Sequence, residues 1–170
     1  MEQNFKGFDL LNKVLQQNET FKQLVNENME QGKIRQFGEE EWDKIKKQNY
    51  ISGNPDLKTF YDIFSLGWNI GNVGMVSRQL SYSYNNVDLV SGFLPLLTGS
   101  INSPNGEHEW LENDKEIIDT TLCLIIDKSL KEEMGYQTEF RFTQQELMQN
   151  ELYRERKEFI NDETINRGFN

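Results

Sequence analysis

The stretch EHEWLENDKEIIDTTL, residues 107–122, decides how we expect this chain to fold. Its two halves have the composition of β-strands, and residues 113–115 between them include Asn and Asp, which tolerate the positive φ of a tight turn. The stretch therefore predicts a β-hairpin. It also holds His108, the one histidine of the chain.

The length of the turn decides where His108 lies relative to Asp119. If residues 113–114 form a two-residue loop, the two side chains lie directly opposite each other, with Cβ atoms about 5 Å apart. If residues 114–115 form the loop, Asp119 is the diagonal neighbour of His108 on the same face. A three-residue loop would place the two side chains on opposite faces. The pattern favours a His–Asp pair.

A carboxylate beside an imidazole fixes the tautomer of the ring and stabilises the imidazolium. These are the tasks of the orienting acid in a catalytic triad, so His108 and Asp119 are candidate catalytic residues. The alternative interpretation is a structural histidine that is hydrogen-bonded to a neighbouring acid.

Length and composition indicate one globular domain. The 170 residues are enough for a substantial core, and an aromatic share of 12% argues against disorder. We expect a single domain over residues 1–160. Within it, residues 1–85 are mainly helical, residues 86–142 form a sheet, and residues 143–160 form a C-terminal helix. Residues 161–170 are expected to be a flexible tail.

The net charge of −10 limits the choice of partners. An acidic surface repels nucleic-acid phosphate and anionic membranes, so we expect neither as a partner. A protein or peptide partner fits better, and mimicry of DNA toward a basic protein stays open. No apolar run resembles a signal peptide or a membrane span, so we expect a cytoplasmic protein. The sequence does not indicate the oligomeric state.

The single cysteine, Cys123, excludes an internal disulfide and a multi-cysteine zinc site, and we expect neither a metal nor a cofactor. The second strand of the hairpin is expected to extend through residues 122–126, a continuous apolar run that is typical of a central strand buried on both faces. Along such a strand Cys123 would lie roughly 13 Å from Asp119, and its Leu neighbours indicate a small buried hydrophobe.

Several local signals mark the ends of helices. Asn18 and Thr20 offer a break and a cap in front of a helical stripe, and Asp127 is placed to cap a helix that Gly135 ends. Residues 136–142 alternate as a strand. Thr143 with Glu146 fits a capping box in front of the last helix.

A loop around Gly71-Asn72-Val73-Gly74 leads into a helix that is expected to reach about Tyr84. Free N–H groups at a helix start can activate a nucleophile or stabilise an oxyanion. The alternative interpretation is that the glycines only permit close helix packing.

Two places together resemble the transglutaminase-like branch of the papain-like cysteine-enzyme superfamily. His108-Glu109-Trp110-Leu111-Glu112 with Ile118-Asp119-Thr120-Thr121 is similar to its His-x-Trp-[Val/Leu]-Glu and Val-x-Asp-x-Thr strands. Gly71-Asn72-Val73-Gly74 is similar to its Gly-Asn-Cys helix start. The resemblance spans roughly residues 67–126. It implies an α+β fold in which a helical N-terminal half packs on an antiparallel sheet of about four strands.

The chain departs from that pattern at the nucleophile. Val73 stands where the family has its cysteine, and valine cannot attack a carbonyl carbon. Ser77, Ser65 and Cys123 are the other nucleophiles considered, and each is poorly placed. Asn72, Trp110 and Trp68 are the candidate cleft-lining residues implied by the resemblance, although Trp110 also fits a core aromatic on a sheet.

Three functions follow as alternatives. The first is a catalytically inactive domain of this family that binds a protein or peptide in the former cleft. The second is an active hydrolase or acyltransferase that uses His108 and Asp119 with an unrecognised nucleophile or with water. The third is an acidic interaction or inhibitor protein unrelated to the family.

Overall fold

A computed structural model describes residues 15–41, 43–44, 81, 83–98 and 105–160 of the chain. The strands of this part are β1 (Ile34–Gln36), β2 (Asp88–Phe93), β3 (Glu107–Glu112), β4 (Glu116–Asp119), β5 (Leu124–Asp127) and β6 (Gln137–Phe142). Its helices include α2 (Glu19–Glu30), α6 (Lys131–Met134), α7 (Gln144–Met148) and α8 (Glu151–Ile160), with short 3-10 helices η2 (Pro95–Leu97) and η3 (Lys128–Leu130). The predicted α+β class is confirmed. Residues 1–14 and 45–80, which make up most of the expected helical half, lie outside the described residues.

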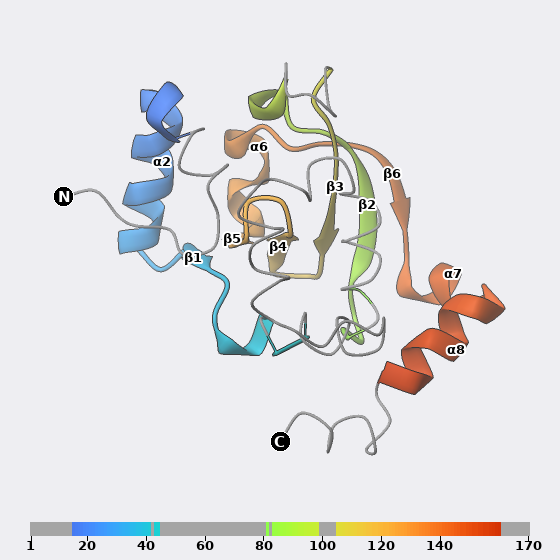
Figure 1. Cartoon of the computed structure of the whole chain (residues 1–170). Coiled ribbons are helices and arrows are strands. Elements are labelled where there is room, and N and C mark those ends of the chain that lie inside the picture. The colour runs from blue at the N-terminus through green and yellow to red at the C-terminus, as the bar shows by residue number, and fades with distance from the viewer. Residues whose placement is uncertain (1–14, 42, 45–80, 82, 99–104, 161–170) are drawn as a thin grey trace.

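The strands form one antiparallel sheet in the order β1-β5-β4-β3-β2-β6. The described part of the chain therefore holds six strands rather than about four. One reason is β1, which lies in the half that was expected to be mainly helical. Figure 1 shows α2 beside the β1 end of the sheet and α7 and α8 beside the β6 end.

The second reason is a hairpin inside residues 117–126, where the sequence predicted one continuous strand. That prediction is wrong. β4 ends at Asp119, the chain turns through residues 120–123, and β5 returns antiparallel with Asp119 paired to Leu124. The turn contains no glycine or proline, and Cys123 takes a positive φ of 53° in it. The apolar run is nevertheless buried throughout, as expected for the middle of a sheet.

The predicted helix caps are present in the structure. Asn18 Oδ1 accepts a hydrogen bond from the Phe21 amide at 3.0 Å and caps α2. Asp127 caps η3, and Gly135 ends α6 in the left-handed conformation with φ 94°. The capping box of Thr143 and Glu146 is present at α7. These predictions are confirmed because each depends only on residues close in sequence.

The last helical region differs from the single helix expected over residues 143–160. α7 ends at Met148 and α8 begins at Glu151. Between them Asn150 Oδ1 accepts a hydrogen bond from the Tyr153 amide at 3.0 Å, so the asparagine starts a new helix.

Alternate side chains of β3 define the two faces of the sheet. His108, Trp110 and Glu112 lie on one, which we call the His108 face. Leu111 lies on the other, which we call the Leu111 face. Because Leu111 pairs with Ile118, the next residue Asp119 lies on the His108 face. Both faces are packed, since Trp110 and Leu111 each have 0% of their surface exposed.

Candidate functional site

The turn between β3 and β4 uses Asp114 and Lys115 as its two-residue loop. The Asn113 amide donates to the Glu116 carbonyl at 3.0 Å, and Leu111 pairs with Ile118. This is the second of the two registers considered from the sequence, and it makes Asp119 the diagonal neighbour of His108. The side chain of Asn113 selects this turn, because its Oδ1 accepts hydrogen bonds from the amides of Lys115 and Glu116 at 2.8 and 2.7 Å.

The structure brings His108 and Asp119 together. His108 Nε2 lies 2.7 Å from Asp119 Oδ2, and the two residues are only 2% and 0% exposed. An ionised carboxylate can only accept hydrogen bonds, so Nε2 carries the proton in this pair. Asp119 thereby engages Nε2, and Nδ1 is the ring nitrogen left for any other contact.

Three further hydrogen bonds hold the Asp119 carboxylate. Its Oδ1 accepts from the amides of Thr121 and Leu122 at 2.8 and 2.9 Å, and its Oδ2 accepts from the Tyr136 hydroxyl at 2.6 Å. Burial alone raises the pKa of Asp119, but the charge of His108 and these hydrogen bonds outweigh burial and hold the pKa below its usual value. The carboxylate is therefore ionised and fixed in position.

Tyr136 is the site residue that the sequence reasoning missed. It follows Gly135 at the end of α6, where a residue after a left-handed cap often packs back on the fold. Burial and the charge of Asp119 raise the pKa of its hydroxyl well above the usual value, so the group remains a donor. Its ring packs edge-on against Trp110 at 4.9 Å between centroids and lies 6.3 Å from the His108 ring.

Trp110 is a core side chain and does not wall a groove. It is 0% exposed, and its ring centroid lies 5.7 Å from that of His108. Its Nε1 donates to Glu112 Oε1 at 2.8 Å. The second interpretation of Trp110, a core aromatic on a sheet, is the one that the structure supports.

Glu112 is a buried carboxylate surrounded by cations. Lys131 Nζ lies 2.7 Å from its Oε1, while Arg141 Nη2 and Lys128 Nζ lie 2.5 and 3.6 Å from its Oε2. Burial raises its pKa, but the hydrogen bonds from Lys131, Trp110 and Arg141 outweigh burial and lower the pKa from 4.5 to about 2. Trp110 thus links this cluster to His108 through one packed layer.

Cys123, the one thiol of the chain, is a poor nucleophile for the His108 pair. Cys123 is 4% exposed, and burial together with the charge of Asp119 raises the pKa of its thiol well above the usual value. A protonated thiol is a poor nucleophile. The hairpin brings Cys123 back beside Asp119, so the separation of roughly 13 Å expected along a continuous strand does not apply. Trp68, Asn72 and Val73, with Ser65 and Ser77, lie outside the described residues.

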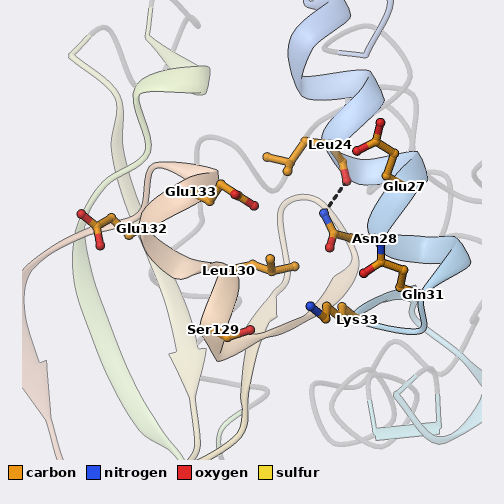
Figure 2. Close-up of a pocket in the computed structure, with 9 residues that line it drawn as sticks. All are labelled: Leu24, Glu27, Asn28, Gln31, Lys33, Ser129, Leu130, Glu132 and Glu133. Atoms are coloured by element: carbon orange, nitrogen blue, oxygen red, sulfur yellow. Dashed lines mark hydrogen bonds between the residues drawn. The ribbon is translucent and has the colours of Figure 1, made fainter.

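A pocket of about 690 Å³ lies between α2 and the segment formed by η3 and α6. Figure 2 shows the side chains of Leu24, Glu27 and Asn28 facing those of Leu130 and Glu133 across it. None of its lining residues belongs to the His108 site. Within the described ranges no group of three or more His, Cys, Asp or Glu side chains could hold a metal ion.

No family model, curated protein or solved structure matches this chain. In the part of the chain that the structure describes, no helix is both long and apolar enough to span a membrane.

Proposed function

We propose that the chain is a catalytically inactive domain of the papain-like, transglutaminase-like kind that acts as a protein- or peptide-binding module. The observation that carries the proposal is the closed surrounding of the His108–Asp119 pair. Asp119 uses both oxygens for four hydrogen bonds, and Trp110 and Tyr136 pack beside the imidazole. A catalytic base must come within about 3 Å of the proton that it removes, and a buried ring restricts such an approach.

The sequence adds a second argument. Val73 occupies the position at which the resembled family carries its nucleophile, and Cys123 is a buried, protonated thiol. With the nucleophile gone, a retained and fully hydrogen-bonded pair serves the fold. The net charge of −10 favours a basic protein or peptide as the partner.

One observation favours a second candidate, an active hydrolase. Asp119 binds Nε2 and fixes the tautomer, which is what a general base acting through Nδ1 on a water molecule requires. The two candidates differ in one measurable respect, because only the hydrolase has turnover that depends on His108.

The test uses p-nitrophenyl acetate and a glutamine-containing peptide as substrates for the wild-type chain and His108→Gln. We expect both proteins to show no ester hydrolysis or ammonia release above buffer. Turnover that His108→Gln abolishes, in a variant whose circular dichroism and unfolding midpoint show it to be folded, would overturn the inactive assignment.

The family assignment has its own test, Val73→Cys in a Cys123→Ser background. If the chain is transglutaminase-like, His108 lowers the pKa of the new thiol, so that iodoacetamide alkylates it at about pH 6. His108→Gln should return the alkylation to ordinary thiol behaviour. If His108→Gln leaves the alkylation of the new thiol unchanged, the chain is not transglutaminase-like.

The binding role is tested with a displayed library of random peptides. Peptides selected on the wild-type chain should bind Trp68→Ala and Asn72→Ala more weakly, while Gln23→Ala on the exposed side of α2 serves as the matched control. Selected peptides that do not respond to either cleft variant would contradict binding in the former cleft.

A further inference from the structure

Strand β6 ends the sheet, and its outer edge pairs with no strand in the described part of the chain. Every second residue of such a strand directs its N–H and C=O groups away from the sheet. Five of the six β6 residues are exposed, and Arg141 is half-buried. Figure 1 shows β6 at the border of the sheet, on the side away from α2. The strand therefore offers a backbone edge that another strand can join.

The edge carries an apolar surface. Phe140 and Phe142 are 58% and 42% exposed, and among the described large apolar side chains they alone are exposed. They pair with Ser91 and Leu89 of β2, which places both rings on the Leu111 face. Leu89 is 1% exposed, so the two rings continue the buried face out to the edge of the sheet.

Gly92 is the residue of β2 that allows β6 to pack at this edge. A Cβ at this position would lie 1.9 Å from the Gln137 carbonyl oxygen, so glycine is what lets β6 approach β2. At the same place β6 bulges, because Ser91 pairs with Phe140 while Gly92 pairs with Thr138. Glu139 is the extra, unpaired residue of the bulge.

Among the described side chains of β6, α7 and α8, exposed carboxylates outnumber exposed cations. Glu139 on β6 and Glu146 on α7 are exposed, as are Glu151, Glu155 and Glu158 on α8. Lys131 and Arg141 are ion-paired with Glu112, Lys157 is buried, and Arg154 is an exposed cation among the carboxylates of α8. The edge thus combines exposed aromatic rings with exposed carboxylates.

We propose that the β6 edge binds an extended basic segment of a partner protein as an added strand. Its apolar residues would alternate along the segment and contact Phe140 and Phe142, and lysine or arginine residues between or beyond them would meet Glu139 and the exposed carboxylates of α7 and α8. The proposal is independent of the proposed function, because these rings lie on the face opposite His108.

A second copy of the chain fits this edge less well. Each copy carries a net charge of −10, and pairing two β6 edges brings Glu139 of both copies together. A bulge and an inward charge are devices that discourage identical edges from pairing. A negative charge does not repel a basic strand, so the same feature selects the partner.

The test measures binding of a short peptide of alternating lysine and valine by fluorescence anisotropy. A peptide of alternating glutamate and valine is the charge control. A lysine–valine peptide with alternate amides N-methylated is the backbone control. We expect only the unmodified basic peptide to bind, with an affinity that falls as salt is added.

Variants locate the site. We expect Phe140→Ser with Phe142→Ser to weaken binding by about tenfold or more, as for loss of central anchors. Glu139→Lys should also weaken it, while Glu30→Lys, an equal charge change on the exposed surface of α2, should leave binding nearly unchanged.

Equal binding of the glutamate peptide or of the N-methylated peptide, or binding that ignores Phe140 and Phe142, would overturn the proposal. A wild-type dimer that Phe140→Ser separates into monomers would overturn it in favour of a second copy as the occupant. The two peptide controls need no variant protein, so they test the proposal even if a substitution impairs folding.

Discussion

Asp119 has two roles, one in the local fold and one in the candidate site. Its Oδ1 holds the amides of Thr121 and Leu122 and so fixes the turn that separates β4 from β5. Its Oδ2 holds His108 and Tyr136. The same carboxylate therefore ends a strand, closes a hairpin and orients an imidazole. A structural role alone explains its burial, which is why the pair by itself does not establish catalysis.

Tyr136→Phe should reveal how much the buried carboxylate depends on its partners. The change removes a donor to a charged acceptor, and such hydrogen bonds contribute about 1.5–3 kcal/mol. We expect the free energy of unfolding in urea to fall by about 2 kcal/mol. Tyr153→Phe is the matched control, because its hydroxyl bonds neutral groups, the Ser81 hydroxyl at 2.7 Å and the Gln144 side-chain amide at 3.4 Å, and its loss should cost about 1 kcal/mol. Equal costs would contradict an ionised Asp119.

Because of Glu112, the free energy of unfolding should decrease as the pH falls. Its pKa is about 2 in the folded chain against 4.5 for a free group, so its contribution is complete above about pH 5 and is lost as the pH falls toward 2. The full shift corresponds to at most about 3 kcal/mol. In Glu112→Gln we expect lower stability at pH 7 and a flatter loss of stability below pH 5, measured by urea unfolding.

Glu139→Gln provides the control for this pH profile. Glu139 is exposed and makes no ion pair in the described structure, so its removal should leave the acid limb unchanged. A Glu112→Gln profile parallel to that of the wild type would show that the carboxylate does not have the lowered pKa.

At the scale of elements, side-chain hydrogen bonds decide the turns of the sheet. Asn113 closes the β3–β4 turn and Asp119 closes the β4–β5 turn, each through an oxygen that accepts two backbone amides. Gly92 acts differently, because it permits the approach of β6 to β2 through the absence of a side chain. The β3–β4, β4–β5 and β2–β6 contacts thus each depend on a particular residue.

Gly92→Ala should loosen β6. The added methyl group meets backbone atoms that cannot move aside cheaply, and overpacking of this kind costs about 1–3 kcal/mol. We expect lower stability and faster hydrogen exchange at the β6 amides, measured by NMR or mass spectrometry. Gly38→Ala is the matched control, since a Cβ there would lie 3.6 Å from Glu41 Oε2, an ordinary contact. Unchanged exchange in β6 would contradict the close approach.

At the scale of the whole molecule, the sheet divides into a buried centre and an exposed edge. β3, β4 and β5 have neighbours on both sides, and their apolar side chains are buried. Among the described strands β6 has one neighbour, β2, and it is exposed along most of its length. Within the described sheet the His108 pair therefore lies in the buried centre, and β6 presents exposed residues at one edge.

Hydrogen exchange of the wild-type chain tests this division. We expect hydrogen-bonded amides of β4 and β5 to exchange only through global unfolding, and those of β6 to exchange through local opening with a smaller free energy. Equal protection of β6 and β4 would show that the edge is covered, and it would count against β6 as an accessible docking strand.

The sequence by itself determined the features that depend on residues close together in the chain. The caps at Asn18, Asp127 and Thr143 and the stop at Gly135 depend on side chains within a few residues of the groups they bind. The β3–β4 hairpin and the shared face of its His–Asp pair also followed from the sequence. Alternation along a strand is a local rule, and both two-residue loops preserve it.

Tertiary structure decided the rest, because the remaining contacts join residues that no local pattern connects. Tyr136 contacts Asp119 although β5, η3 and α6 lie between them in the chain, and β1 is too short to show a period of its own. Residues 122–126 are apolar whether they continue the preceding strand or belong to a separate one, because both arrangements are buried in the middle of the sheet. Only the pairing of β5 with β4 and β1 distinguishes the two arrangements. That pairing is a property of the assembled sheet.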